Sequence, residues 1–219
     1  MGGTAKTTDL EAALEALPIF PLSQVVLFPQ AVLPLHIFEP RYRAMLKDCL
    51  GTHGAMAIAL LRGASKDAEL PPIASVAGAG VIVEHQWQKD GRANILLHGQ
   101  ARVRLVELPF VPPYRRARAT ILHDSADAVS PSDRAALLAC AGAFAAEVRQ
   151  KSPEFSFRIP ENLEPGVLSD YCAHHLVVDT GLRQQLLEEP SPRERVRLVT
   201  NELAAQHSAF VRESGGVLH

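Results

Sequence analysis

The sequence predicts an α+β protein in which a β-rich half is followed by an all-helical half. Between residues 17 and 122, short apolar and β-branched runs are separated by Pro, Gly and Asp-Gly, which is typical of strands and turns. After residue 124 the apolar residues recur at helical spacing behind Ser-Pro start signals. The composition, 47% hydrophobic and 21% charged over 219 residues, indicates one or two folded domains.

The first half is predicted to contain a tail and a β-rich subdomain. Residues 1–16 form the tail, which we expect to be partly disordered with a turn or two of helix after residue 9. Asp90-Gly91 supplies turn chemistry, which predicts a hairpin over 81–98. The β-rich subdomain spans residues 17–124, with strands expected at 19–22, 31–38, 56–61, 80–87, 93–98, 102–107 and 115–122.

One helix is predicted to interrupt these strands. Glu39-Pro40 places proline at a helix start, where its missing N–H costs nothing, and Gly51 is a natural end. Four apolar residues recur at helical spacing between these points: Tyr42, Met45, Leu46 and Cys49. The sequence therefore predicts a short helix with one buried face.

The second half is predicted to be a helical subdomain over residues 130–214. Ser130 and Ser191 each precede a proline and are followed three residues later by an acid, which is typical of a helix N-cap. Each opens a long helix with an apolar stripe, and shorter helices are expected at 168–176 and 182–187. The proline-containing segment 151–165 is expected to be a loop.

Charge and cysteine usage narrow the function classes. A net charge of −2 gives no whole-chain attraction to nucleic acid or to anionic lipid. Cys49, Cys140 and Cys172 are odd in number and far apart, so neither a disulfide framework nor a zinc ribbon is indicated. The first residues lack the apolar stretch of a secretory signal, and no apolar run approaches a membrane span. We expect a cytoplasmic protein without membrane contact.

The motifs for ATP hydrolysis and for serine-lysine proteolysis are missing. No lysine follows a glycine, so there is no phosphate-binding P-loop, and we interpret Gly78-Ala-Gly80 as a bulge or close backbone packing. Ser65-Lys66 lies in a polar segment where the lysine would stay solvated and charged. We therefore expect no enzymatic activity and no cofactor.

Cysteine and histidine patterns also give weak signals. Cys49 and His53 are four residues apart, but nothing orients the histidine as a catalytic base. Acid–histidine pairs with helical spacing occur twice, in Asp170/His174 and His175/Asp179, without the three ligands of a catalytic zinc site. We expect no metal.

Aromatic residues in expected loops are the main candidates for binding. They either fasten a loop to the core or present an apolar contact surface, and the sequence leaves both alternatives open. The candidates are Phe28, Phe110, Tyr114, Phe155 and Phe157.

The arginines of two expected strands form the most charged local feature. They are Arg102, Arg104, Arg115, Arg116 and Arg118. If the two strands are neighbours, a basic stripe results, which either contacts phosphates or is a solvated sheet face. No aromatic residue alternates with these arginines, so stacking on nucleic-acid bases has little support.

Several short motifs, in order along the chain, resemble the Lon protease N-terminal domain family, most closely its short stand-alone bacterial members. The first half supplies Leu17-Pro-Ile-Phe-Pro-Leu22, Val26-Leu-Phe-Pro29, Leu33-Pro-Leu-His-Ile-Phe-Glu-Pro-Arg-Tyr42, Asp90-Gly-Arg92 and Gly99-Gln-Ala-Arg102. The second half supplies Leu168-Ser-Asp-Tyr-Cys-Ala-His-His-Leu176, Leu186-Leu-Glu-Glu189 and Arg193-Glu-Arg195. The resemblance covers residues 17–210.

The resemblance implies a β-rich pseudo-barrel subdomain followed by a helical bundle, and a module that recognises substrate polypeptide without ATPase or protease domains. We expect unfolded or flexible polypeptide as the partner, together with a larger protease or chaperone. Nucleic-acid binding through the arginines is the alternative, and a small-molecule enzyme is the least supported. The expected polypeptide contacts are Phe28, Phe110, Tyr114, Arg116, Arg118, Phe155 and Phe157.

Overall fold

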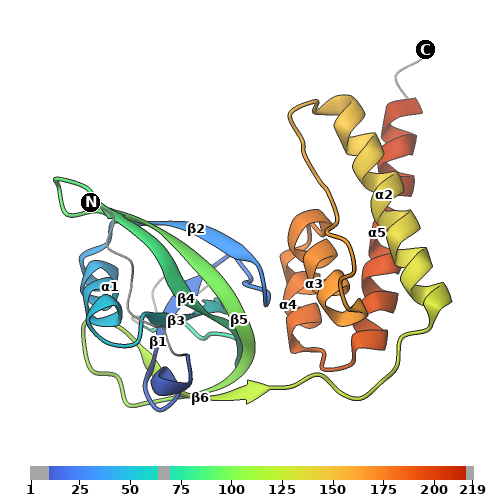
Figure 1. The fold of residues 1–219 in the computed structure, drawn as a ribbon. Coiled ribbons are helices and arrows are strands. Elements are labelled where there is room, and N and C mark those ends of the chain that lie inside the picture. The colour runs from blue at the N-terminus through green and yellow to red at the C-terminus, as the bar shows by residue number, and fades with distance from the viewer. Residues whose placement is uncertain (1–9, 64–69, 216–219) are drawn as a thin grey trace. The chain divides into compact units, whose positions relative to one another are not determined.

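The computed structural model of the protein describes residues 10–63 and 70–215 (Figure 1). The chain forms two compact units that meet in sequence between His123 and Asp124. Over these described residues, the first unit contains the sheet and one α-helix, and the second contains four helices. No helix among the described residues is long and apolar enough to cross a membrane.

The first unit is built on a six-stranded sheet with the order β2-β5-β4-β3-β1-β6, in which β6 also pairs with β5. Five strands therefore close on themselves, and β2 is added at the side (Figure 1). Strands β1 and β3 run parallel, whereas the other pairs are antiparallel. The elements are η1 (Glu11–Ala13), β1 (Leu17–Leu22), β2 (Val32–Ile37), α1 (Pro40–Gly51), β3 (Ala55–Leu60), β4 (Val76–Trp87), β5 (Ala93–Glu107) and β6 (Arg116–Leu122). This arrangement confirms the expected pseudo-barrel.

Strand β5 differs from the prediction, which divided it into strands at 93–98 and 102–107. It is one strand, because β4 pairs along nearly its whole length and Gln100 is taken up as a bulge. The predicted close backbone packing at Gly78 and Gly80 is confirmed. A Cβ at Gly78 would collide with the Leu27 carbonyl oxygen, and one at Gly80 would lie 2.5 Å from the His98 carbonyl oxygen.

Two groups of buried side chains form the core of the first unit. One lies among the closed strands and consists largely of small or branched residues, including Ile19, Ala57 and Val103. The other joins α1 to the sheet, and all four residues of its predicted stripe are buried: Tyr42, Met45, Leu46 and Cys49. Burial of this face fixes α1 on the sheet and positions the chain on either side of it.

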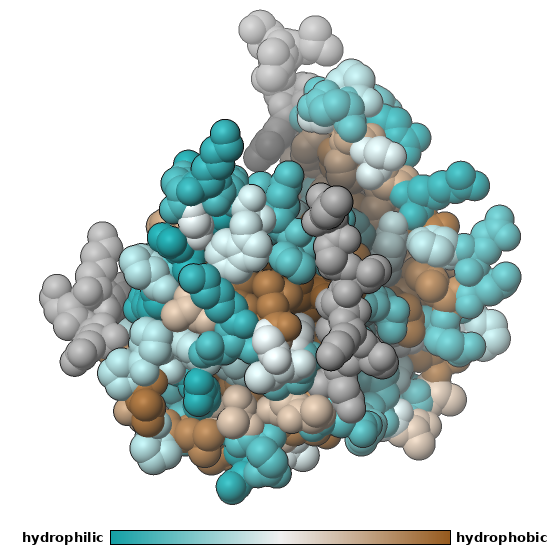
Figure 2. Space-filling view, turned by 60° about the vertical axis from the view of Figure 1, so that its left-hand side comes forward, coloured by the Kyte–Doolittle hydropathy of each residue, from teal (hydrophilic) through white to brown (hydrophobic). Residues whose placement is uncertain are grey.

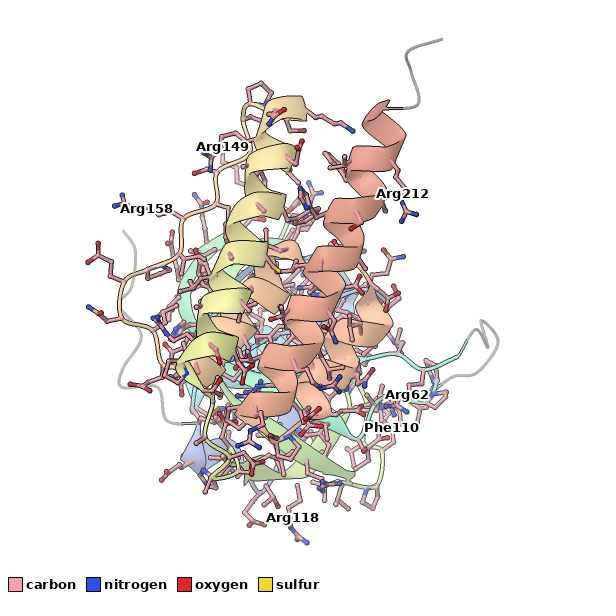
Figure 3. The ribbon with its side chains drawn as sticks, turned by 90° about the vertical axis from the view of Figure 1, so that its right-hand side faces the viewer. Arg62, Phe110, Arg118, Arg149, Arg158 and Arg212 are labelled. Atoms are coloured by element: carbon pink, nitrogen blue, oxygen red, sulfur yellow. The ribbon has the colours of Figure 1, made fainter. Side chains whose placement is uncertain are left out.

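The second unit consists of α2 (Pro131–Lys151), α3 (Pro165–Leu176), α4 (Thr180–Glu188) and α5 (Pro192–Gly215). Helices α2 and α5 lie side by side (Figures 1 and 3). Both predicted N-caps are confirmed. The Ser130 hydroxyl accepts from the Asp133 N–H at 3.1 Å, and the Ser191 hydroxyl accepts from the Glu194 N–H at 3.3 Å.

Arg195 is the largest polar side chain in the core of the second unit, with a relative exposure of 1%. It donates to both carboxylate oxygens of Asp124, at 2.8 and 2.6 Å, and lies 3.3 Å from an oxygen of Asp170. It also donates to the Glu189 carbonyl at 3.0 Å. These contacts fasten the first residue of the unit to α3 and α5.

Candidate functional site

A groove of about 670 Å³ in the first unit collects five aromatic rings from separate parts of the chain. They are Phe20 on β1, Phe38 before α1, Tyr42 on α1, and Phe110 and Tyr114 between β5 and β6. Three of these side chains are buried, whereas Phe38 and Phe110 are 59% and 39% exposed. The space-filling view likewise shows apolar surface among polar side chains (Figure 2). The groove thus has a rigid aromatic floor and an accessible aromatic rim.

Local packing explains where the floor comes from. The first turn of α1 follows Phe38 and Glu39 directly, so the buried face of the helix places Tyr42 against β1. The Phe20 and Tyr42 ring centroids are 4.3 Å apart. The Arg41 guanidinium lies 4.6 Å from the centre of the Tyr42 ring. Burial raises the pKa of Tyr42, so its hydroxyl stays protonated at neutral pH.

Each charged side chain that lines the groove has a partner of opposite charge. Arg41 forms an ion pair with Glu39 at 2.8 Å. Arg115, which is largely buried, donates from its Nε to Glu107 at 2.7 Å and from its Nη1 to the Pro71 carbonyl at 2.6 Å. The groove is therefore apolar and close to neutral, which favours uncharged segments of a ligand over strongly charged ones.

The predicted contact residues of the first unit do not all meet in the groove. Phe110 lies on its rim and Tyr114 in its floor. The Tyr114 hydroxyl donates to Asp48 at 2.6 Å and accepts from Arg116 at 2.6 Å, so its polar end is already occupied. Phe28 has no exposed surface, which corresponds to the core-fastening alternative.

The arginine stripe is shorter than the sequence suggested. Strands β5 and β6 are neighbours, as expected. Val106 of β5 lies opposite Arg118 of β6, and because side chains alternate along each strand, Arg104, Arg116 and Arg118 lie on one exposed face. Arg102 and Arg115 are buried instead. Arg118 is bonded to Glu15 at 3.1 Å. In Figure 3, Arg118 and Phe110 project from different parts of the surface.

Phe155 and Phe157 belong to the second unit, where they join a half-buried aromatic cluster on α3 with Tyr171 and His175. The Tyr171 hydroxyl donates to the Arg158 carbonyl at 2.7 Å, which fastens the loop before α3 to this helix. Burial lowers the pKa of His175, and it lowers that of His174 to about 4. Both rings are therefore neutral at neutral pH.

Sequence reasoning missed Phe20, Phe38 and Tyr42 as groove residues, because the pattern around each predicts a strand or a buried helix face. A usable signal was the position of Phe38 between a strand and the Glu39-Pro40 helix start, where chains leave the sheet. It also missed a second cavity of about 420 Å³ on the outer face of β2, β5 and β4.

The weak catalytic and metal patterns have structural explanations. The Cys49 thiol lies 3.4 Å from the Ala55 carbonyl oxygen, to which it donates, and burial raises its pKa to about 12. His53 Nδ1 accepts from the Ala55 N–H at 3.0 Å. A protonated, buried thiol is a poor nucleophile. Within residues 10–63 and 70–215, no group of three His, Cys, Asp or Glu side chains could hold a metal ion.

Comparisons with known proteins agree with this architecture. The Lon protease of Roseiflexus castenholzii is 28% identical over 204 residues, which cover 90% of this chain and 25% of that protein. A crystal structure of a Lon N-terminal domain protein from Xanthomonas campestris has a TM-score of 0.61 at 22% identity and covers 83% of this chain and 95% of the other. The N-terminal domain of a Mycobacterium avium complex Lon protease has a TM-score of 0.64 at 18% identity, with coverages of 86% and 98%.

The two solved structures establish the shared α+β fold. The chain spans about a quarter of the length of the Lon proteases that it matches. Residues 16–205 match the family model described as the ATP-dependent protease La (LON) substrate-binding domain. Since this match extends over most of the sequence, the chain belongs to the Lon substrate-binding domain family.

Proposed function

We propose that this protein is a non-catalytic module that binds extended segments of unfolded or flexible polypeptide in the aromatic groove of its first unit. It acts in the cytoplasm as an adaptor or holdase linked to protein quality control or proteolysis, with a larger protease or chaperone as partner. The observation that carries the proposal is the exposed rim of Phe38 and Phe110 above a floor of buried rings. Apolar side chains of a bound polypeptide would be withdrawn from water on these rings.

The floor also supports recognition of a peptide backbone. Among the described residues, the Tyr42 hydroxyl has no hydrogen-bond partner, although its side chain lines the groove. A protonated phenol can donate to a backbone carbonyl of the ligand, which is present in every sequence. The combination of apolar rings and one such donor suits many different polypeptides.

Binding of a labelled, permanently unfolded casein-like protein, followed by fluorescence anisotropy, tests the proposal. Replacing Phe38 and Phe110 together by Ala should weaken binding by about fivefold or more, because each removes an exposed aromatic anchor. Val106→Ala is the matched control, since Val106 is 63% exposed on the outer face of β5 and lies outside the groove. Circular dichroism confirms that each variant is folded. Unchanged binding by the folded double variant would place the site elsewhere, and no binding by the wild type at tens of micromolar would refute the function.

Nucleic acid is the alternative ligand, through the exposed face of Arg104, Arg116 and Arg118. In that case, labelled RNA would bind with an affinity that falls steeply with salt, and replacing these arginines would matter more than replacing the aromatic residues. The existing ion pairs of Arg116 and Arg118 reduce the charge that this face offers to phosphates.

A further inference from the structure

The second cavity, of about 420 Å³, lies over an ordered array of six side chains on the outer sheet face. The register of the strands beneath the cavity places Pro34 of β2 opposite Leu96 of β5, and Leu96 opposite Glu84 of β4. The next row consists of His36, Asn94 and Gln86. Because directly opposed residues of antiparallel strands project from the same face, the six side chains form two parallel rows.

The two rows differ in chemistry. The first passes from two apolar side chains, Pro34 and Leu96, to the carboxylate of Glu84. In the second, His36 Nδ1 and Asn94 Oδ1 are 2.7 Å apart, so their relative positions are fixed by a hydrogen bond. Glu84 is exposed and forms no ion pair with any described residue. The cavity therefore combines an apolar strip with one uncompensated negative charge.

This cavity adjoins the aromatic groove. Leu35 and His36 line both, so the two cavities meet at β2. Among the described strands β2 pairs only with β5, and Pro34 lacks an N–H at the centre of its free edge. A ligand strand would lack one hydrogen bond at the centre of that edge, which disfavours continuous strand pairing and favours contacts through side chains.

We propose that the Glu84 cavity is a subsite for a lysine or arginine side chain that flanks the apolar segment held in the aromatic groove. The inference rests on the proposed function and specifies its substrate class: polypeptides in which a basic residue follows or precedes an apolar stretch. The aliphatic stem of that residue lies along Pro34 and Leu96, and its charged end reaches Glu84. The neutral groove thus binds the apolar part of one polypeptide segment, and the acidic cavity binds its basic residue.

Three fluorescein-labelled peptides test this inference. They share one apolar core of Phe, Leu and Gly and carry a flank of Lys, Glu or Gln. Glu84→Lys should weaken binding of the Lys-flanked peptide by about fivefold, the upper range for an exposed ion pair, and should strengthen binding of the Glu-flanked peptide. Binding of the Gln-flanked peptide should change little. Glu161→Lys, an exposed position in the second unit, makes the same change in net charge and is the matched control.

The outcomes separate the two hypotheses. Wild-type binding of all three peptides with equal affinity, unaltered by Glu84→Lys, would overturn the subsite and leave the groove as the site. An equal effect of Glu161→Lys would also overturn it, because the preference would then reflect net charge alone. Failure of every peptide and of the unfolded protein to bind would refute the proposed function itself.

Discussion

Replacing Arg195 by Met should destabilise the helical unit by about 3–5 kcal/mol, because it removes one partner of a buried ion pair. The Arg195 side chain is 1% exposed and that of Asp170 is 5% exposed, so the Asp170 carboxylate would stay buried without its counter-charge. The Asp124 carboxylate would be affected less, because its side chain is 42% exposed and can be solvated. For a unit of this size, the loss corresponds to a fall in Tm of roughly 12–40 °C.

Thermal and urea unfolding followed by circular dichroism at helical wavelengths measure this effect. Arg197→Met is the matched control: Arg197 lies on the same helix but is 58% exposed and paired with exposed Glu194, so its loss should cost about 1 kcal/mol or less. Adding Asp170→Leu to Arg195→Met should recover part of the stability, because the remaining buried charge is then removed. Equal stability of the Arg195→Met and Arg197→Met variants would refute the reasoning.

Two further predictions concern backbone packing and pH. Gly78→Val should lower the free energy of unfolding, measured in urea, by about 1–3 kcal/mol, because the new Cβ would meet the Leu27 carbonyl oxygen. Gly142→Ala, in open space on α2, should raise the free energy of unfolding by up to about 1 kcal/mol. Unchanged stability of the Gly78→Val variant would contradict the packing at Gly78. Because the pKa of His174 is lowered in the folded protein, the unfolded state binds a proton at this residue first when the pH falls. The stability that the neutral His174 contributes is therefore complete above pH 6.5 and is lost as the pH falls toward 4. The stability difference between wild type and His174→Gln should therefore shrink over this range, and a difference independent of pH would contradict it.

The sequence predicted elements whose signals are local. The Ser130 and Ser191 caps, the Glu39-Pro40 helix start and the Asp90-Gly91 turn each act within a few residues, and all four lie at the expected places. The order of motifs along the chain also led to the correct family, because that order reflects the whole fold.

Features that depend on tertiary pairing were not accessible in this way. The continuity of β5 requires β4 as a partner that accommodates the bulge at Gln100. The burial of Arg102 interrupts a stripe that strand alternation alone predicts to be exposed. Of the groove residues, Phe110 and Tyr114 had loop positions that suggested contact, whereas Phe20 and Phe38 come together only after β1 and β2 take their places in the sheet.

The pairing of β5 has a consequence for how the groove responds to its ligand. The first half of β5 holds β2, and its second half holds β6, while β4 pairs along the other side. Within the described part of the chain, strand β2 is thus hydrogen-bonded to the sheet along one side only, although it leads directly into Phe38. Such a strand separates from its neighbour at a lower free energy than strands bonded on both sides, and its amide protons exchange with solvent sooner. One wall of the groove can therefore yield to side chains of different size while the closed strands keep their hydrogen bonds.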